Sequence, residues 1–281
     1  MMREIFKTVL MLSAEGAVLT LLLMILKPYT SKKFSARWQK YIWLAVIVCM
    51  LVPAWKFIPE RNVQKYAPQI VTTRQNTNRT DANIVDTKIN NGGENGVKPA
   101  ENPVTKPKIR INIFDLFSYL WLIGVIVFFI LGTANYCVFL AKHRKNSINL
   151  EENRTFDEVK DELKIKRKIR VRISRADTSP MLVGTVFPVI YLPSVPLDKE
   201  SEKMVFRHEL MHFKKRDLLY KYISFAVNAL HWFNPFAYVL STNIAESCET
   251  ACDTAVVKNM DGDMKNLYMK TILDLAQKKK S

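Results

Sequence analysis

"LFSYLWLIGVIVFFILGTANYCVFLA", residues 116–141, is the longest stretch of the chain without a charged side chain. Its 26 residues are mostly apolar, and about 20 such residues suffice for a helix to cross a bilayer. We therefore predict a transmembrane helix over 113–141. Two further apolar runs, at about 5–26 and 38–58, predict two more spans. The chain is thus expected to be a multi-pass protein of the cell membrane.

Basic side chains flank these runs and predict how the spans are oriented. The formal net charge of +16 is typical of proteins that bind nucleic acid or an anionic membrane surface. It is also typical of proteins that have basic loops beside membrane spans. Two clusters follow the first and third spans: Lys27, Lys32, Lys33, Arg37 and Lys40, then Lys142, His143, Arg144 and Lys145. The positive-inside rule places both in the cytoplasm and the N-terminus outside. The expected partner of the charge is the lipid bilayer, and direct nucleic-acid binding is not expected, because no basic-aromatic module is evident.

Residues 59–112 are expected to form a flexible extracytoplasmic loop. They are rich in Asn, Thr, Lys, Gly and Pro and poor in aromatic residues, a composition that buries too little apolar surface for a core. The chain is thereby divided into two spans over 1–58, the outer loop, the third span over 113–141 and a cytoplasmic domain over 142–281.

The region 142–281 has the pattern of an α+β domain that is mainly helical. Thr155 and Glu158 have capping-box spacing, so a helix is expected to begin at Thr155. "KIRVRIS" (168–174) and "MLVGTVFPVIYLPS" (181–194) predict two or three strands of a small sheet. Three further helical patterns follow, which begin near Asp198, Asn234 and Met264.

"RHELMHFKKRD", residues 207–217, contains an HExxH motif. Residues four apart share one face of a helix, so His208 and His212 can direct their imidazoles to one point. Zinc is bound by such nitrogens, and with a third protein ligand it holds a water whose pKa falls to near 7. Glu209 would accept the proton of that water as general base. The alternative is a chance match on an ordinary amphipathic helix.

The third ligand is expected in "ESCETACDTAV", residues 246–256. Glu249 and Asp253 are one helical turn apart. We predict Glu249 as the third zinc ligand and Asp253 as the acceptor of a hydrogen bond from a ligand imidazole. Glu246, one turn earlier, is an alternative ligand. A solvated helix face is the ordinary fate of such acids, but the small and apolar residues around them favour burial.

Four other residues in this region receive weaker assignments. Cys248 and Cys252 are one turn apart and could form a metal pair, but small buried residues on a helix are the better interpretation. Tyr220 and His231 are candidates for stabilising the oxyanion. His231 lies in the apolar "ALHWF", which is more typical of a core histidine.

Residues 222–245 carry no charge and are long enough to be mistaken for a fourth span. A span would put Glu249 outside while His208 and His212 stayed inside, so one ion could not bind all three. We therefore predict a hairpin that is broken near Asn234-Pro235, since proline lacks an amide hydrogen and disfavours helix before it. Each half is expected to lie in the domain core or to dip against the membrane.

The motif "HELMHFKKRD", the later "NPF" and "ESCETACDTAV", the preceding spans and "SPMLVGTVFPVIYLP" together resemble the BlaR/MecR-type membrane metallopeptidases of Gram-positive bacteria. The resemblance implies a zincin-like protease domain facing the cytoplasm, with zinc on His208, His212 and Glu249 and with Glu209 as the base. It also implies an antirepressor role in β-lactam sensing, in which a DNA-binding repressor is lost. The expected substrate is then a cytoplasmic protein, and self-association is left open.

Members of that family continue into a further span and a penicillin-binding sensor domain with a Ser-x-x-Lys nucleophile. This chain ends at "QKKKS" and is expected to lack both, so β-lactam recognition by the chain itself is not predicted. Two alternatives to signalling remain. One is a housekeeping zinc protease that cleaves misfolded membrane proteins, and the other is a non-catalytic transducer with a vestigial motif.

Overall fold

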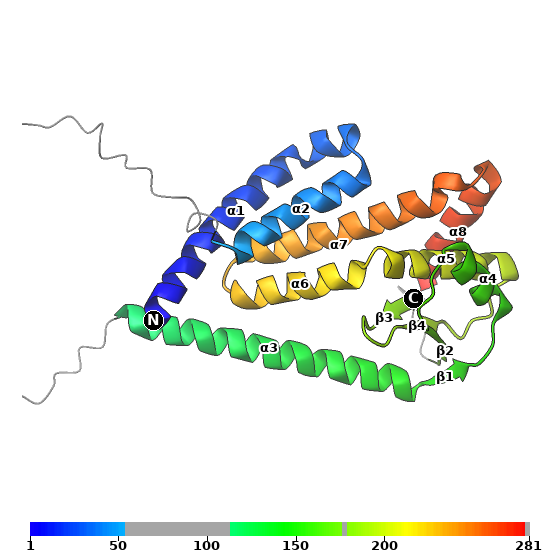
Figure 1. Ribbon diagram of the computed structural model, residues 1–281, viewed down its shortest axis with the longest axis horizontal. Helices are drawn as coiled ribbons and strands as arrows, with labels where there is room; N and C mark the ends of the chain where they lie inside the picture. The colour runs from blue at the N-terminus through cyan, green and yellow to red at the C-terminus, as the bar shows by residue number, and fades with distance from the viewer. Residues whose placement is uncertain (54–112, 176–178, 279–281) are drawn as a thin grey trace, which may run out of the picture. The chain divides into compact units, whose positions relative to one another are not determined.

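The computed structural model describes residues 1–53, 113–175 and 179–278. These residues belong to one compact unit, whereas the second unit, 56–111, lies outside the described residues. The predicted outer loop, 59–112, and the end of the predicted second span, 54–58, therefore fall outside the description. The described part is mainly helical with one small sheet, in line with the predicted balance of elements (Figure 1).

Among the described residues, two helices are long and apolar enough to cross a membrane. They are α1 (Met2–Lys33, 32 residues) and α3 (Ile113–Lys145, 33 residues). Much of their apolar surface is exposed; on α3, for example, Ile123, Ile130 and Val138 are 57%, 61% and 66% exposed. Such a surface suits contact with lipid. The described part of the predicted second span, α2 (Ala36–Leu51), has only 16 residues, so the third span stays a prediction.

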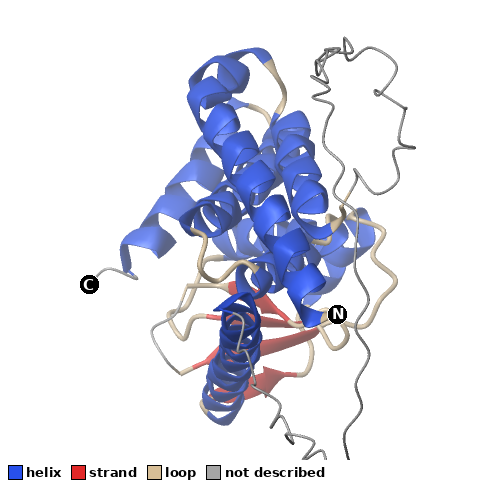
Figure 2. Ribbon diagram, turned by 90° about the vertical axis from the view of Figure 1, so that its left-hand side faces the viewer, coloured by secondary structure: helices blue, strands red, loops and turns tan. Residues whose placement is uncertain are grey.

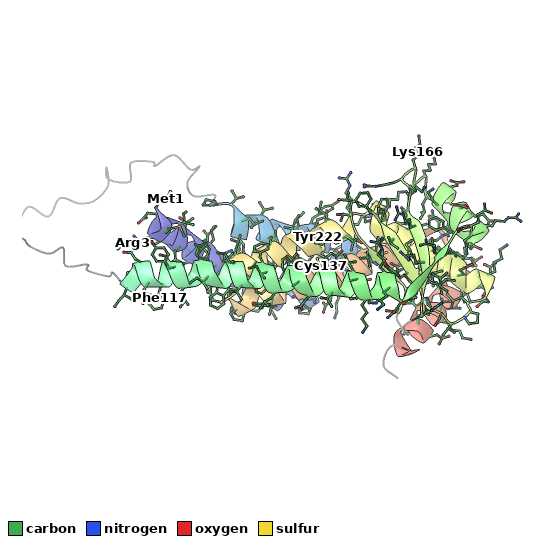
Figure 3. All side chains as sticks on the ribbon, turned by 90° about the horizontal axis from the view of Figure 1, so that it is seen from below. Met1, Arg3, Phe117, Cys137, Lys166 and Tyr222 are labelled. Carbon is green, nitrogen blue, oxygen red and sulfur yellow. The ribbon has the colours of Figure 1, made fainter. Side chains whose placement is uncertain are left out.

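The first ends of α1 and α3 meet. Arg3 lies over the ring of Phe114, 5.5 Å from its centroid, and Figure 3 shows Arg3 and Phe117 at the same end of these two helices. α2 runs back beside α1, with which it packs. Two spanning helices that begin side by side would enter a membrane from the same face, and the side on which they begin stays a prediction.

The predicted hairpin is confirmed by α6 (Asp217–Leu230) and α7 (Pro235–Val256), which pack against each other. Asn234 caps α7, since its Oδ1 accepts a hydrogen bond from the amide of Phe236 at 2.9 Å, and Pro235 occupies the first helical turn, where its missing N–H costs nothing. The hairpin returns the chain to the end from which it came, so His212 and Glu249 lie on one side.

The hairpin is enclosed more deeply than the sequence suggested, because it packs along α1, α2 and α3 (Figure 1). One apolar cluster joins α2 to the hairpin; its buried members are Trp43, Val46, Ile47, Met50, Val227, Ala237, Leu240, Ile244 and Cys248. The tip makes polar contacts as well. The Trp121 indole donates to the carbonyl of Leu230 at 2.9 Å, and the Asn234 amide donates to the hydroxyl of Ser13 at 2.8 Å.

His231 is a structural residue at this tip and has no place near the predicted metal ligands. It is 1% exposed, and its Nε2 donates to the carbonyl of Met50 at 3.1 Å. His231 is therefore a core histidine, as its apolar surroundings favoured, and it is no longer a candidate for stabilising the oxyanion. A buried imidazole in an apolar tip needs a partner of this kind.

Four strands form one sheet, visible as red arrows in Figure 2: β1 (Ser147–Leu150), β2 (Arg170–Ser174), β3 (Met181–Val183) and β4 (Val189–Leu192). The order is β1-β2-β4-β3. β2 and β4 are parallel, and the other two pairs are antiparallel. β3 is therefore an edge strand, and β3 packs against α5 (Lys199–Lys214).

The sheet, α4 (Arg154–Glu162) and α5 share the main core outside the helical bundle. Its fully buried side chains include Val159, Ile190 and Phe206. The helix cap predicted at Thr155 is wrong: α4 begins at Arg154, and Asn153 is the cap, with its Oδ1 accepting from the amide of Phe156 at 2.8 Å. Asn153 also has a side-chain oxygen that can accept a hydrogen bond, and it stands two residues before Thr155.

α5 begins where the sequence predicted, with Asp198 as its cap and the Asp198 carboxylate 3.0 Å from the amide of Ser201. The chain closes with a 3-10 turn (Val257–Asn259) and α8 (Gly262–Lys278), close to the predicted start at Met264. α8 packs against α5 and contributes Tyr268 to a small apolar cluster with Met204, Cys252 and Val256. This packing brings Tyr268 to the predicted metal ligands.

Candidate metal centre

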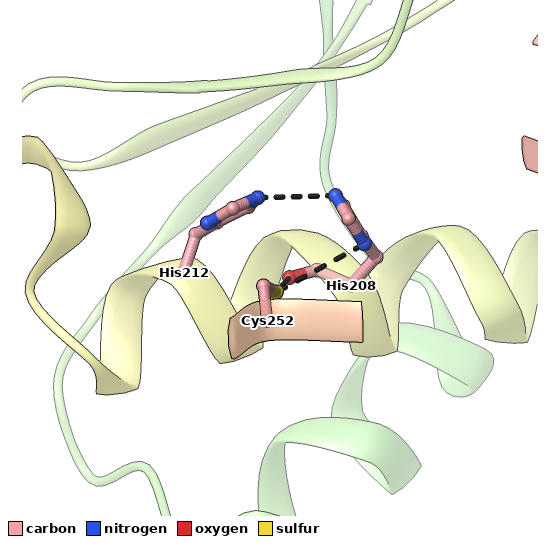
Figure 4. A group of neighbouring side chains, drawn as sticks. All are labelled: His208, His212 and Cys252. Carbon is pink, nitrogen blue, oxygen red and sulfur yellow. Dashed lines mark hydrogen bonds between the residues drawn. The ribbon is translucent and has the colours of Figure 1, made fainter. Parts of the chain in front are cut away.

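His208 and His212 face each other across one turn of α5, as their spacing predicted. Their Nε2 atoms are 3.0 Å apart, and their ring centroids are 4.6 Å apart at 86°. Figure 4 shows the two rings with these nitrogens directed toward each other. Two nitrogens can approach so closely to one point only because residues four apart share a helix face.

Glu249 approaches the same point from α7. Its Oε2 lies 3.1 Å from Nε2 of His212 and 3.7 Å from Nε2 of His208. Two ligands bound to zinc at 2.0–2.1 Å with tetrahedral angles lie about 3.3 Å from each other. The three donor-to-donor distances of 3.0, 3.1 and 3.7 Å lie on both sides of this value. The residues present therefore fit a zinc ion.

Cys252 is a second candidate for the third ligand, because its Sγ and the two histidines form a group within 4.8 Å. Its contacts argue against that role. Sγ lies 3.9 Å from Nδ1 of His208 and 3.5 Å from the His208 carbonyl oxygen, on the far side of the ring from Nε2 (Figure 4). The two nitrogens of one imidazole point away from each other, so an ion held by Nε2 does not sit beside this thiol.

Glu246, the alternative ligand in the sequence prediction, belongs to another contact. Its Oε2 forms an ion pair with Lys27 Nζ at 2.6 Å, which joins α7 to α1. Lys27 also donates to the side-chain oxygen of Asn243 at 2.8 Å. Glu249, and not Glu246, is the acid that the helix presents to the imidazoles.

The outer nitrogen of His208 is held by Tyr268 and, through it, by Asp253. Nδ1 of His208 lies 2.7 Å from the Tyr268 hydroxyl, which in turn donates to Oδ1 of Asp253 at 2.6 Å. Asp253 itself is 3.4 Å from Nδ1, so its contact with the imidazole is mainly indirect. This network assigns the proton to Nδ1 and leaves the Nε2 lone pair free for a cation.

The outer nitrogen of His212 is held by Asp217, which the sequence analysis did not assign to the site. Nδ1 of His212 donates to Oδ2 of Asp217 at 2.7 Å. Asp217 is 1% exposed, and its other oxygen forms an ion pair with Lys40 of α2. Asp217 is therefore a buried residue of the site. Lys40, which was counted with the basic loop residues after the first span, is instead buried in α2 beside it.

Two signals could have identified these residues. Asp217 follows the motif at the start of the next helix, where its carboxylate is able to reach back to the preceding one. Lys40 is the last basic residue before an apolar run and lies five residues beyond the cap of α2 at Ser35. Tyr268 has no comparable signal, since only the packing of α8 brings it to His208.

The surrounding carboxylates favour positive charge at this point. Burial by itself would lower the pKa of His212, but hydrogen bonds with Asp217, Cys252 and Glu249 raise it to about 11. Burial would raise the pKa of Glu249, yet the two imidazoles lower it well below its ordinary value. A site that draws protons onto two imidazoles so strongly is equally suited to a divalent cation.

Glu209 lies beside the three donors in a cleft of about 180 Å³, which Pro180, Met181, Leu182 and Lys221 also line. The Glu209 side chain is 7% exposed. Burial raises the pKa of its carboxyl above the ordinary value, while the neighbouring imidazoles oppose the rise. A carboxylate with a raised pKa is a better proton acceptor than an exposed one.

Tyr220, the other residue predicted to stabilise an oxyanion, does not line this cleft. Its ring lies under the ammonium of Lys40, with Nζ 3.9 Å from the ring centroid. Lys221, the next residue on α6, lines the cleft instead and has its Nζ 3.7 Å from Oε1 of Glu249.

Comparison with known proteins agrees with this site. A sequence profile of the BlaR1 peptidase M56 family matches residues 7–281. The chain therefore belongs to the peptidase M56 family, a group of metallopeptidase-like hydrolases, and this membership implies a metal cofactor.

The relatives that the chain matches are named as regulatory proteins and as a methicillin resistance protein. The regulatory protein BlaR1 of Bacillus licheniformis is 30% identical over 167 residues, which cover 57% of this chain and 28% of the relative. The methicillin resistance mecR1 protein of Staphylococcus aureus is 25% identical over 280 residues, which cover 94% of this chain and 45% of the relative. The regulatory protein BlaR1 of Staphylococcus aureus is 24% identical over 286 residues. The chain spans less than half the length of these curated relatives.

Proposed function

We propose that this chain is a membrane-anchored zinc endopeptidase whose active site faces the cytoplasm. His208, His212 and Glu249 are the zinc ligands, and Glu209 is the catalytic base. One observation carries the proposal: three donor atoms from α5 and α7 lie within 3.7 Å of one another, beside the buried Glu209. The outer nitrogens of both histidines are engaged by Tyr268 and Asp217, the arrangement that orients metal-binding imidazoles.

The chemistry divides between the metal and the chain. A bound zinc ion lowers the pKa of water at its open position and polarises the peptide carbonyl. Glu209 accepts the proton of the attacking water and delivers it to the leaving amine. Lys221 lines the same cleft and is the proposed source of positive charge beside the developing oxyanion, in place of Tyr220 and His231.

The substrate is proposed to bind as an extended strand on β3. Met181 and Leu182 of this edge strand line the cleft that contains Glu209. An edge strand offers unpaired backbone groups to an incoming peptide, and its side chains alternate between pockets. The cleft then positions a peptide bond between Glu209 and the imidazoles. The same strand also contributes Leu182 to the core, so it supports both roles.

The proposed role is proteolysis in antibiotic or cell-wall-stress signalling that inactivates a DNA-binding repressor. Its support is the family membership together with the names of the relatives, which are regulatory and methicillin resistance proteins. The site lies at the end of α3 that carries Lys142, Arg144 and Lys145, the end expected in the cytoplasm. Quality control of membrane proteins is the second candidate, and a winged-helix repressor encoded beside this gene would favour signalling over it.

The test compares the purified full chain with its Glu209→Gln variant in lipid nanodiscs. Zinc content is measured by elemental mass spectrometry, and endopeptidase activity is measured on fluorescent casein. We expect about one zinc per chain in both proteins. Cleavage of casein by the variant is expected to be at least about 100-fold slower than cleavage by the wild type. Equal function of both proteins in a cellular induction assay would instead indicate a non-catalytic transducer.

A further inference from the structure

Lys40 is the buried basic residue of α2 and stands directly before the apolar run of that helix. Its side chain is 8% exposed and forms an ion pair with Asp217, whose side chain is 1% exposed. The ammonium also lies 3.9 Å from the ring centroid of Tyr220. Burying an ammonium is costly unless a partner carries the opposite charge, so each member of this pair holds the other in place. The pair joins α2 to the first residue of α6.

Asp217 uses both of its oxygens. Oδ1 forms the ion pair with the ammonium of Lys40, and Oδ2 accepts a hydrogen bond from Nδ1 of His212 at 2.7 Å. Residues 177 positions apart thus share one carboxylate. The result is an unbroken chain of contacts from Lys40 on α2, through Asp217 on α6, to His212 on α5, whose Nε2 faces Glu249 and His208.

We propose that Lys40 is a positioning residue through which α2 sets the orientation of the His212 imidazole. This inference rests on the proposed function, since His212 is one of the proposed zinc ligands. Without Lys40, the buried Asp217 carboxylate has lost its second charge partner and is free to rotate toward other donors. The imidazole then loses the fixed acceptor that directs its Nε2 toward the metal.

Through Lys40 and Asp217, α2 is connected to the proposed metal ligand His212. α2 packs on α1 and on the α6–α7 hairpin, and it is the described element that precedes the connection to α3. A displacement of α2 by about 1 Å is enough to break a charged hydrogen bond of normal length. The position of α2 thereby affects His212, although no residue of α2 lines the cleft that contains Glu209.

The test measures metal binding by the full chain in nanodiscs. Zinc affinity is determined by competition with a chromophoric chelator, and the visible spectrum of bound Co²⁺ reports ligand geometry. Lys40→Met is expected to weaken zinc binding by about 10–100-fold, the usual effect of losing a partner that orients a ligand, and to change the Co²⁺ spectrum. Lys40→Gln, which keeps a hydrogen-bond donor and most of the side-chain volume, is the second variant should Lys40→Met fail to fold, and it is expected to weaken binding in the same direction.

Lys27→Met is the matched control. Lys27 also forms an ion pair with a glutamate of α7 across elements, but that glutamate, Glu246, makes no contact with the imidazoles among the described residues. It is expected to keep wild-type affinity and spectrum. A folded Lys40→Met or Lys40→Gln variant that equals the wild type, or a Lys27→Met variant that shows the same loss, overturns the inference and leaves the proposed function standing. A wild type that binds no zinc overturns both.

Discussion

At the scale of single residues, the choice between Glu249 and Cys252 decides what kind of site this is. Both lie on α7 one turn apart, but they meet opposite sides of the His208 ring. Two histidines and a glutamate, with the fourth position open, form a common catalytic zinc site, whereas thiolate ligands predominate in closed structural sites. The geometry favours the carboxylate.

The first prediction follows from this choice. Glu249→Gln is expected to lower zinc content of the purified chain to a small fraction of the wild type, because the amide is a poorer ligand than a carboxylate. Cys252→Ser, the matched control, is expected to retain about one zinc per chain. Elemental analysis after dialysis against a weak chelator separates the two. Retention by the glutamine variant with loss in the serine variant would show that Cys252 is the ligand.

Tyr268 carries the second prediction. Its hydroxyl joins Nδ1 of His208 to Asp253, so Tyr268→Phe removes the acceptor that orients the imidazole and keeps the ring in the core. Zinc affinity is expected to fall by about 10-fold or more, measured by chelator competition. Tyr238→Phe, which deletes a hydroxyl bonded to the Trp232 carbonyl at 2.9 Å, is expected to leave it unchanged. Equal affinities in the two variants would show that the bridge does not orient His208.

The sequence predicts some of these residues and not others for a physical reason. His208, Glu209 and His212 are fixed by the period of one helix, which any sequence shows. Glu249 follows from the need for a third ligand on a nearby helix. Asp217 has a signal in its place just after the motif, but its burial depends on how α6 packs against α5. Tyr268 has no such signal, because only the packing of α8 brings it to His208.

At the scale of elements, the hairpin tip is held against α3 by a close approach at Gly124. A Cβ added there would lie 2.4 Å from the ring of Trp232, which is too rigid to yield in place. Trp232 in turn donates to the carbonyl of Trp121 at 3.3 Å. The absence of a side chain at Gly124 is therefore what lets α3 receive the hairpin.

The third prediction is that Gly124→Ala destabilises the chain by about 1–3 kcal/mol, the usual cost of overpacking. Thermal unfolding in detergent, followed by tryptophan fluorescence, is expected to show a midpoint several degrees lower. Gly262→Ala is the control, since an added Cβ there meets nothing within 4 Å. An unchanged midpoint for Gly124→Ala would mean that Trp232 has room to move.

Helix starts were predicted well where one cap stands alone and poorly where caps compete. Asp198 and Asn234 are single good caps and begin α5 and α7. Near α4, Asn153 and Thr155 both offer side-chain acceptors, and Asn153 is the one used. The predicted hairpin break near Asn234-Pro235 also holds, because proline and a capping residue act there together.

At the scale of the molecule, contacts cross the boundary at residue 142 that the sequence suggested for a separate domain. The α6–α7 hairpin belongs to the later part of the chain, yet it packs on α1, α2 and α3. All described residues fall in one compact unit. The sequence did not reveal this, because an apolar run looks the same whether it faces lipid, a protein core or other helices.

The fourth prediction concerns the fragment 142–281. Expressed without α1–α3, it is expected to aggregate, because the apolar face of the hairpin loses its cover. It is also expected to bind zinc poorly, since Lys40 is missing from the fragment. Size-exclusion chromatography and zinc content, each compared with the full chain in the same detergent, measure both effects. A monodisperse fragment with full zinc content would show that residues 142–281 form an independent domain.

The length of α7 has a consequence for how lipids influence this protein. α7 is one helix of 22 residues, about 33 Å long at the usual rise. Near its first residue it is fastened to the middle of α1 through Asn234 and Ser13, and toward its other end Glu249 meets the imidazoles. Acyl chains that are too short or too long shift or tilt membrane-spanning helices such as α1. Because α7 is fastened to α1 and is one continuous helix, a shift of α1 is expected to move Glu249. Turnover is therefore expected to peak at one bilayer thickness.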